Sequence, residues 1–387
     1  MKIAFFVQYA HKAGTYFRWH NLALALLKQG HVVHVYAGDF SWRAKSREEL
    51  RDGIVYKITP SLVSSTFINN PSDPLSAIRR CFVRVEEQYD VYHLFQPFLQ
   101  AALPWYFLKL FRKGLFVYDW DDLWTNGLHQ SPKTLKERYI FSLVSFLEQR
   151  LPRMANLTTV CSGFLANQSC MVNKPVQVLY NGFWSKALPD ERNALRTKWG
   201  LAHTCFYIAY IGKTSDELNW IATAIQTYRA QLSEKSVRLV IAGPPKQLIE
   251  QEGLLDDELV LYFGELRPDE AAELAATADL GLLPLENNLF NQSRFPIKFF
   301  DFLSVGTPVY LSNVGEVGKL ATSKQIGAIA VPVGKDNWVN GLLPTIERLR
   351  TSGRTIDTQL LYDSCGWSAI GVKLLNAYQE KKVNADL

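Results

Sequence analysis

The chain has 387 residues, of which 48% are hydrophobic, 13% aromatic and 20% charged. This is the balance of a globular protein, and it excludes a disordered or fibrous chain. At about 150 residues per domain, the length predicts two or three domains, and two of roughly 180 residues fit it well. The sequence has no run of 18 uncharged apolar residues, so we expect no membrane-spanning helix.

The amino-terminal segment and the cysteines indicate the compartment. The segment MKIAFFVQYAHKAG carries a charge and a short apolar run but no small-residue cleavage site, so we expect no signal peptide. The cysteines are odd in number and scattered, at Cys81, Cys161, Cys170, Cys205 and Cys365. Without CxxC or Cys/His ligand spacing, they predict buried thiols in a reducing cytoplasm.

The net charge of +5 is unevenly distributed. Residues 1–184 carry 21 Lys and Arg against 13 Asp and Glu, and residues 185–387 carry 21 against 24. This asymmetry predicts two domains with different partners. A positive first half suits anionic lipid, an anionic substrate or nucleic acid, but simple solubility charge explains it equally well.

The first half of the chain alternates strands and helices. Strands are predicted over residues 2–7, 31–36, 91–94, 115–118, 157–161 and 176–179. A loop with Gly14 follows the first strand, apolar residues from Trp19 to Leu27 share one helical face, and a longer helix is predicted over 135–151. The alternation is typical of a doubly wound parallel sheet.

The pattern breaks at the turn dipeptide Asn181-Gly182 and then restarts. Strands are predicted over residues 206–211, 237–242, 259–263, 280–283, 308–311 and 328–331. Helices are predicted over 219–230 and 358–382. The sequence therefore predicts an N-terminal domain over 1–183, a C-terminal domain over 184–357 and a C-terminal helical segment over 358–387.

Ligands of open parallel sheets bind beyond the carboxyl ends of the strands, so the loops there carry the candidate chemistry. The loop after the first strand has no GxGxxG fingerprint, although Gly14 before a helix leaves backbone NH groups for an anion. A plain tight turn is the alternative. Gly212-Lys213 follows the first strand of the second half but lacks the spacing of a phosphate-binding P-loop.

Three carboxylates, Asp119, Asp121 and Asp122, lie within four residues at the end of a predicted strand. Like charges this close repel one another, so their clustering calls for a functional or structural explanation. They could bind sugar hydroxyls, act as an acid or base, or hold a divalent metal. Helix capping is the alternative, but a cap needs only one aspartate.

The stretch PLENNLFNQSRFPIKFFDFLSVGTPV, residues 284–309, combines a polar loop with a short predicted helix that has Pro296 in its first turn. Backbone NH groups at the helix start, together with Arg294 and Lys298, would make a phosphate site. Asp301, one turn further, can accept two ribose hydroxyls. An ion pair between Lys298 and Asp301 on a solvated face is the alternative.

Read together, these segments resemble the GT-B glycosyltransferases, specifically the retaining family 4 group that uses nucleotide-sugar donors. The resemblance covers essentially the whole chain and rests on the order and spacing of its segments: GTYFRWHNLALALLKQGHVVHVYAG, YDVYHLFQP, TTVCSGF, VLYNGFW, IAYIGK, VIAGPP, VLYFGEL and FPIKFFDFLSVGTPVYLSNVG. It implies two Rossmann-like domains facing across a cleft, with the last helix packed back on the first domain.

The resemblance also implies roles for individual residues. Lys213 stands where the family has an arginine on the donor pyrophosphate, and Asp301 stands in place of the second glutamate of an E-x7-E pattern that holds the donor ribose. The predicted catalytic residues are Lys213, Asp119 and Asp121. The predicted donor-binding residues are Gly14, Gly212, Lys213, Gly264, Leu266, Asn291, Ser293, Arg294, Phe295, Ile297, Lys298 and Asp301.

The sequence departs from the family pattern in three places. Ser293 replaces the first glutamate of E-x7-E, which usually contacts the sugar. The second basic residue of the phosphate site is missing near Asn219, where Lys298 or Arg294 would substitute. The family histidine after a strand of the first domain is replaced by the segment Asp119-Trp120-Asp121, whose aspartates would accept the 6-hydroxyl of the sugar or orient the acceptor.

The resemblance implies a retaining hexosyltransferase that uses a UDP-sugar, with glucose or a close hexose as the sugar, to build a polysaccharide, glycolipid or cell-envelope glycan. It implies no cofactor and no metal, although the aspartate cluster leaves a metal open. The segment from Trp105 to Lys113 suits a lipid-linked acceptor and a peripheral contact with the inner face of the membrane; a core helix with a basic end is the alternative. Nucleic acid is not expected as a partner.

Two rival functions share the fold. A nucleotide-sugar epimerase would turn over a donor with no acceptor present. A non-catalytic subunit would keep the fold and bind no nucleotide, which the departures at Ser293 and Asn219 leave conceivable.

Overall fold

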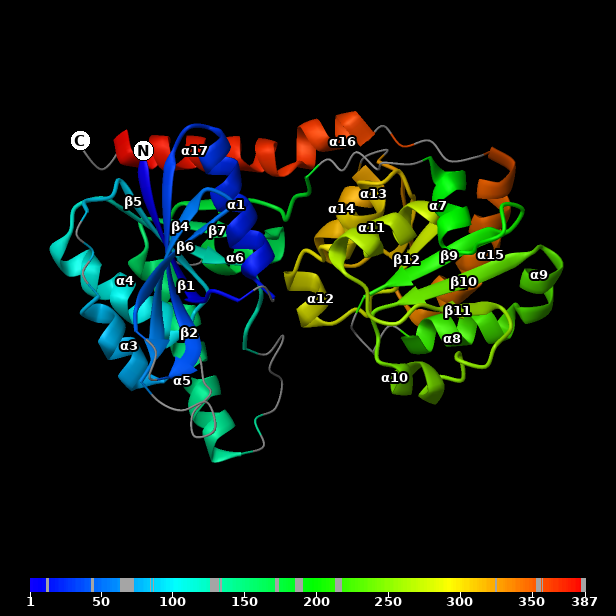
Figure 1. The fold of residues 1–387 in the computed structure, drawn as a ribbon, viewed down its shortest axis with the longest axis horizontal. Coiled ribbons are helices and arrows are strands. Elements are labelled where there is room, and N and C mark those ends of the chain that lie inside the picture. The colour runs from blue at the N-terminus through cyan, green and yellow to red at the C-terminus, as the bar shows by residue number, and fades with distance from the viewer. Residues whose placement is uncertain are drawn as a thin grey trace. The chain divides into compact units, whose positions relative to one another are not determined.

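The computed structural model of the chain describes residues 1–11, 14–42, 45–62, 73–83, 85, 87–125, 132, 134–170, 174–184, 191–212, 218–323, 326–352, 356 and 358–383. They form two compact units, drawn as ribbons in Figure 1. The first unit comprises Met1–Asn181, Ser293–Phe295 and Trp367–Leu387, and the second comprises Gly182–Gln292 and Pro296–Gly366. The chain thus leaves the first unit after Asn181 and returns to it twice.

The first unit is built on an eight-stranded sheet with the order β3-β4-β2-β1-β5-β6-β7-β8. Its strands are β1 (Lys2–Tyr9), β2 (Val32–Trp42), β3 (Arg47–Arg51), β4 (Ile54–Ser61), β5 (Val91–Phe95), β6 (Leu115–Trp120), β7 (Leu157–Val160) and β8 (Val176–Val178). All neighbouring pairs are parallel except β3 and β4, which are antiparallel. The predicted doubly wound parallel sheet is confirmed, with one antiparallel strand at its edge.

The β3–β4 hairpin is the part of this sheet that the sequence analysis missed. In β4 the side chains of Ile54, Tyr56 and Ile58 are buried, but β3 reads REELR and has no apolar run. The two strands are joined at Asp52 and Gly53, which have φ of 51° and 81° as a tight hairpin turn requires. A charged edge strand resists pairing with other chains, which explains why β3 has no hydrophobic pattern.

Helices cover both faces of this sheet. They are α1 (Tyr16–Lys28), α3 (Pro74–Cys81), α4 (Leu99–Phe111), α5 (Leu135–Met154), α6 (Gly163–Cys170) and α17 (Trp367–Val383). Helix α17 packs on α1, and its Tyr378 hydroxyl lies 2.6 Å from Nδ1 of His93 in β5. Burial lowers the pKa of His93 to about 3, so its ring is neutral. The predicted packing of the last helix on the first domain is therefore confirmed.

The predicted single helix over 358–382 is wrong in one respect, because it is two helices. Helix α16 (Thr358–Cys365) ends before Gly366, and α17 begins at Trp367. The NH of Gly366 bonds to the carbonyl of Tyr362 at 2.7 Å, and Gly366 also forms a β-bridge with Phe183. The β-bridge at Gly366 thus separates the two helices at the point where the chain passes from the second unit to the first.

The second unit is built on a six-stranded parallel sheet with the order β11-β10-β9-β12-β13-β14. Its strands are β9 (Phe206–Ile211), β10 (Val237–Ala242), β11 (Val260–Tyr262), β12 (Leu280–Leu283), β13 (Val309–Ser312) and β14 (Ala328–Val331). This is the strand order of a Rossmann sheet, whose topological switch point lies between β9 and β12. In the first unit the corresponding point lies between β1 and β5.

The helices of the second unit surround its sheet (Figure 1). They are α7 (Arg192–Lys198), α8 (Leu218–Thr227), α9 (Arg229–Glu234), α10 (Lys246–Gln251), α11 (Pro268–Thr277), α12 (Leu289–Ser293), α13 (Lys298–Leu303), α14 (Gly315–Ser323), α15 (Lys335–Ser352) and α16. The predicted helix over 219–230 is divided between α8 and α9. The predicted polar loop before Pro296 contains α12, which ends where the chain enters the first unit.

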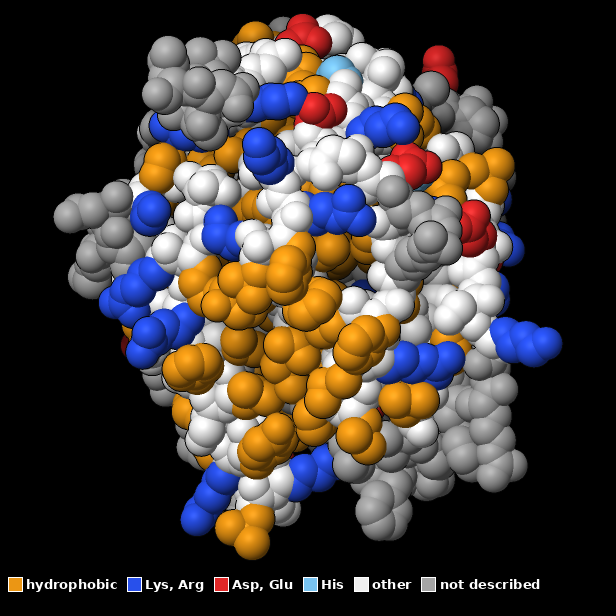
Figure 2. Space-filling view, turned by 90° about the vertical axis from the view of Figure 1, so that its left-hand side faces the viewer, with side chains coloured by type: hydrophobic (Ala, Val, Ile, Leu, Met, Phe, Trp, Pro, Cys, Tyr) orange, Lys and Arg blue, Asp and Glu red, His pale blue; other side chains and the backbone are white. Residues whose placement is uncertain are grey.

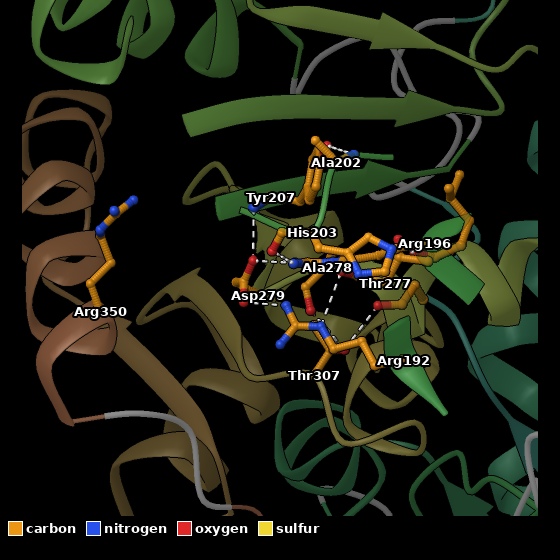
Figure 3. A network of polar contacts seen from close by, with 12 residues as sticks. Arg192, Arg196, Ala202, His203, Tyr207, Thr277, Ala278, Asp279, Thr307 and Arg350 are labelled. Carbon is orange, nitrogen blue, oxygen red and sulfur yellow. Dashed lines mark hydrogen bonds and ion pairs between the residues drawn. The ribbon is translucent and has the colours of Figure 1, made fainter. Parts of the chain in front are cut away.

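A polar network at the amino end of the second sheet holds α7 in place (Figure 3). Asp279, directly before β12, forms ion pairs with Arg192 and Arg196 of α7 and accepts the NH of Tyr207, at the start of β9, at 2.8 Å. The Arg196 side chain is 6% exposed, and its Nε also donates to the carbonyl of Thr277. Because this network lies at the amino ends of the strands, away from the ligand-binding edge, we interpret it as structural.

Replacing Asp279 should therefore destabilise the second unit. Asp279→Asn leaves two arginines without their carboxylate, and the expected loss in unfolding free energy is about 3 kcal/mol, the low end for breaking a buried ion pair. Urea denaturation measures it. The control is Asp269→Asn, whose carboxylate and partner Arg267 are 70% and 72% exposed and should contribute less than about 1 kcal/mol. Equal losses in the two variants would contradict this interpretation.

Candidate functional site

A buried ion pair lies at the carboxyl edge of the first sheet. Arg18 of α1 donates from Nε to Oδ1 of Asp119 at 2.7 Å and from Nη2 to Oδ2 at 2.9 Å. The two side chains are 2% and 0% exposed. Asp119 is the last but one residue of β6, so the pair ties the start of α1 to the end of that strand. Bidentate bonds between charged groups are strong and fix the orientation of both side chains.

The same pair reaches two further segments of the first unit. Asp119 also accepts a hydrogen bond from Oγ1 of Thr159 in β7 at 2.5 Å. Nη1 of Arg18 donates to the carbonyl of Leu179 at 2.9 Å and to Oδ1 of Asn181 at 3.0 Å. The hydrogen-bonding groups of both side chains are thus used within the protein, and Asp119 acts in the structure as the partner of Arg18.

Asn181 is one of the residues that hold the tripeptide Ser293–Phe295 in place. Its Nδ2 donates to the carbonyl of Phe295 at 2.8 Å, and Oγ of Ser162 donates to the carbonyl of Ser293 at 2.5 Å. The ring of Tyr180 stacks on Phe295 with centroids 5.0 Å apart. Three of the predicted donor-binding residues are therefore held by the first unit, although they are close in sequence to others on the second.

The other two aspartates of the cluster lie in the loop after β6. Asp121 is 7% exposed, and its Oδ1 has no hydrogen-bond partner among the residues that the structure describes. Burial, together with the charges of Asp122 and Asp119, raises its pKa well above the ordinary value, although Thr15 donates a hydrogen bond to it. Asp121 therefore binds its proton more tightly than an ordinary aspartate does.

Asp122 is half-buried beside two arginines. Burial raises its pKa to about 6, against the opposing effect of the positive charges of Arg294 and Arg18. The structure thus brings Arg294, a predicted phosphate ligand, close to the acidic loop of the first unit. Gly14 precedes Thr15 and α1 at the same edge, with φ of 56°.

Glu148 of α5 fixes the shape of this loop, and the sequence analysis missed it. Its carboxylate accepts hydrogen bonds from Nε1 of Trp120 at 2.9 Å, from the NH groups of Trp124 and Thr125 at 2.7 and 3.0 Å, and from the Thr125 hydroxyl. Burial raises its pKa despite these bonds. One feature of the sequence could have revealed this role of Glu148: it is a carboxylate between the apolar residues Val144 and Leu151 of a predicted helix.

Within the described part of the chain, no group of three or more His, Cys, Asp and Glu residues is arranged to hold a metal ion. The three aspartates that suggested such a site do not converge on one point. Asp119 directs both oxygens at Arg18, whereas Asp121 interacts with Thr15 and Asp122 with Arg294.

In the second unit, Lys298 lies across the end of β9. Its Nζ is 3.2 Å from the hydroxyl of Tyr210 and 4.7 Å from the centre of that ring. A Cβ atom placed on Gly212 would lie 2.1 Å from Cε and 2.2 Å from Nζ of Lys298. Gly212 thus leaves the space that the lysine occupies, and the lysine brings a positive charge to the switch point of the sheet.

Other predicted residues reach the same edge. The NH of Gly212 bonds to the carbonyl of Ala242, and the NH of Gly243 bonds to the carbonyl of Gly264, so the ends of β9, β10 and β11 are adjacent. Half-buried Leu266 follows in the loop after β11. Lys213 lies outside the described residues.

The remaining candidate residues lie in and just before α12 and α13. Asp301 and Ile297 are exposed, so both can meet a ligand. Asn291 is 6% exposed, and its Nδ2 donates to the carbonyl of Glu286 at 2.9 Å. Its side-chain amide is therefore directed at its own loop.

Two family models match this chain, and together they cover most of it. Residues 14–183 match the model described as Glycosyltransferase Family 4, and residues 203–348 match that of Glycosyl transferases group 1. The chain belongs to the family 4-like glycosyltransferases of the GT-B fold.

Similar proteins agree with this family. TuaH of Bacillus subtilis strain 168, named as a teichuronic acid biosynthesis glycosyltransferase, is 23% identical over 215 residues, which are 53% of this chain and 52% of that protein. The chain thus matches about half the length of this curated relative.

Two solved structures show the same fold over whole chains. Sucrose-phosphate synthase from Thermosynechococcus elongatus has a TM-score of 0.71 at 14% identity, over 98% of both chains. HepE from Anabaena, in complex with UDP and glucose, has a TM-score of 0.68 at 16% identity, over 98% of this chain and 99% of its own.

The acidic loop should make the stability of this glycosyltransferase depend on pH. The folded-state pKa of Asp122, about 6, lies above the ordinary value near 4 of an unfolded chain, so between about pH 4 and 6 the folded protein binds the proton more tightly. The contribution of Asp122 to the free energy of unfolding is present below about pH 4 and is lost as the pH rises through 6.

Asp122→Asn removes this contribution. The unfolding free energy of the wild type minus that of the variant should fall by on the order of 1–2 kcal/mol between about pH 4 and 7. Loss of the Asp122 charge also lowers the Asp121 pKa, which changes the difference in the same direction. Urea denaturation at several pH values measures it, with Asp269→Asn as the control. A difference independent of pH would show that Asp122 has an ordinary pKa.

Proposed function

We propose that the chain is a retaining hexosyltransferase that transfers glucose or a close hexose from a UDP-sugar to an acceptor hydroxyl of a polysaccharide, glycolipid or cell-envelope glycan. The observation that carries the proposal is Lys298 lying over Gly212 at the switch point of the second sheet. A cation held at the carboxyl edge of a parallel sheet, beside its switch point, suits the binding of a nucleoside diphosphate.

The donor would bind along the carboxyl edge of the second sheet. Its diphosphate would lie by Gly212 and Lys298, with Lys213 as a further cation. Exposed Asp301 would accept the ribose hydroxyls, and the loop at Gly264 and Leu266 would bind the base through backbone groups. HepE, whose fold is the same, has been solved with UDP-glucose, which supports the choice of nucleotide.

The chemistry would rest on stabilising the leaving group. Negative charge develops on the diphosphate as the bond to the sugar breaks, and positive groups fixed in advance lower the energy of that state. In this proposal Lys213 and Lys298 supply the charge, and an oxygen of the leaving phosphate takes the proton of the acceptor hydroxyl. The new bond then forms on the face that the diphosphate leaves, which retains the configuration.

The acceptor would bind at the acidic loop of the first unit. Asp121 accepts a hydrogen bond from Thr15, and its Oδ1 has no hydrogen-bond partner among the described residues. A carboxyl group accepts hydrogen bonds from sugar hydroxyls and, once protonated, can also donate one. The name of TuaH supports a cell-envelope glycan as the product.

The proposal is tested first with nucleotides. UDP at about 100 times its dissociation constant should stabilise the wild type by roughly 2.7 kcal/mol, and GDP, dTDP and ADP should stabilise it less. Thermal unfolding with each nucleotide at about 1 mM measures this. No shift with any nucleotide would favour a non-catalytic subunit. Turnover of a UDP-sugar with no acceptor present would favour an epimerase.

Two substitutions test the donor site directly. Lys298→Met and Asp301→Ala each remove a bond to a charged group, so UDP affinity should fall by about 1.5–3 kcal/mol, roughly 10- to 150-fold. Calorimetric titration with UDP measures the loss. The control is Lys319→Met, a 68% exposed lysine of α14. Unchanged UDP affinity in the first two variants would place the diphosphate elsewhere.

A further inference from the structure

One face of the first unit exposes apolar side chains from two neighbouring helices. On α3 and the residue that ends it, Leu75, Ile78 and Phe82 are 55%, 49% and 77% exposed. On α4, Leu110 and Phe111 are 59% and 72% exposed, and two further exposed residues are Tyr106 and Phe107. We name these seven residues the α3–α4 apolar face. Figure 2 shows a large hydrophobic patch on this side of the first unit.

The face is continuous and is not needed for the core. The rings of Phe82 and Phe107 are 6.5 Å apart between centroids, and those of Phe107 and Phe111 are 5.1 Å apart. The opposite side of α4 already fills the core with Ala101 and Trp105, both 0% exposed. A helix that is apolar on all sides normally has a partner on each side.

The structure refines the membrane segment expected over residues 105–113. Trp105 is buried, and its Nε1 donates to the carbonyl of Tyr92 at 2.9 Å, so it belongs to the core. Helix α3, which the sequence analysis did not consider, supplies three residues of the face instead. An exposed patch built from two helices in this way marks an interaction surface.

The charge around this face is mainly positive. Residues 74–118 contain six Lys and Arg, of which Arg80 is buried, and three acidic residues, Glu86, Glu87 and Asp90. In Figure 2, Lys and Arg side chains border the hydrophobic patch, and the Asp and Glu side chains gather toward the top of the view. Two of these acidic residues, Glu87 and Asp90, form ion pairs with Lys2 and Lys382. An apolar and negatively charged partner fits such a surface.

A second copy of the chain does not satisfy this requirement. In a symmetric dimer the same patch faces itself, so the basic border of one copy would meet that of the other. An anionic bilayer satisfies both conditions, because its acyl chains accept the aromatic side chains and its phosphates accept Lys and Arg. Among the described helices, none is long and apolar enough to cross a membrane.

We propose that the α3–α4 apolar face binds the surface of a membrane containing anionic lipid. Phe82, Leu110 and Phe111 enter the boundary between head groups and acyl chains, and Arg79, Arg112 and Lys113 contact the phosphates. The inference goes beyond the proposed reaction and does not depend on it, since lipid binding needs no nucleotide.

Co-sedimentation of the full chain with vesicles tests it. The protein should bind vesicles of phosphatidylcholine with about one third phosphatidylglycerol at least tenfold more tightly than pure phosphatidylcholine, and binding should weaken as salt rises. The double variant Phe82→Ser/Phe111→Ser should bind anionic vesicles at least tenfold more weakly, because apolar burial drives insertion. Lys113→Glu should weaken binding about tenfold.

The control is Val372→Ser, a 46% exposed residue of α17, which packs on α1. Its vesicle binding should equal that of the wild type. All the variants should keep the wild-type melting temperature and UDP affinity, which separates a failure here from a failure of the donor site. Equal binding to both kinds of vesicle, or binding unchanged in the double variant, overturns the proposal. A dimer in sedimentation that the double variant abolishes also overturns it and makes the face a protein interface.

Discussion

The bidentate pair between Arg18 and Asp119 is the interaction on which the carboxyl edge of the first sheet depends. Both side chains are buried, so removing either one leaves an unpaired charge in a medium that solvates it poorly. The pair also orients Asn181, the last residue before the chain leaves the unit, and Asn181 in turn holds the carbonyl of Phe295. One ion pair thereby positions a helix, two strands and a segment more than a hundred residues away.

The pair also determines the chemistry of its neighbours. Burial raises the pKa values of Asp121 and Asp122, and the positive charge of Arg18, which is hydrogen-bonded to Asp119, only partly opposes that rise. Asp121 and Asp122 therefore bind protons more tightly than ordinary aspartates do, whereas Asp119 is the hydrogen-bonded partner of Arg18. A carboxyl group that readily takes a proton suits sugar hydroxyls, whereas a divalent cation prefers ionised oxygens.

The strands were predictable where they are buried on both faces, since such strands read as continuous apolar runs. The bounds predicted for β9 and β10 are those observed. The charged edge strand β3 and the break at Gly366 were not predictable. An exposed edge strand and a backbone bridge leave no periodic pattern of hydrophobic residues in the sequence. In the site, the loops were predictable from their place after strands. Their partners Arg18 and Glu148 were not, because α1 and α5 meet the β6 loop only in the fold. The role of Lys213 stays a prediction.

The excursion of Ser293–Phe295 into the first unit has a consequence for how the chain acquires its structure. The first unit needs this tripeptide and α17, so its contacts span nearly the whole sequence, from Tyr378 back to His93 and from Phe295 back to Asn181. During synthesis the amino-terminal sheet is therefore made early but completed last. Contacts of such long separation slow folding, and the apolar side chains of α1 wait for α17 to cover them.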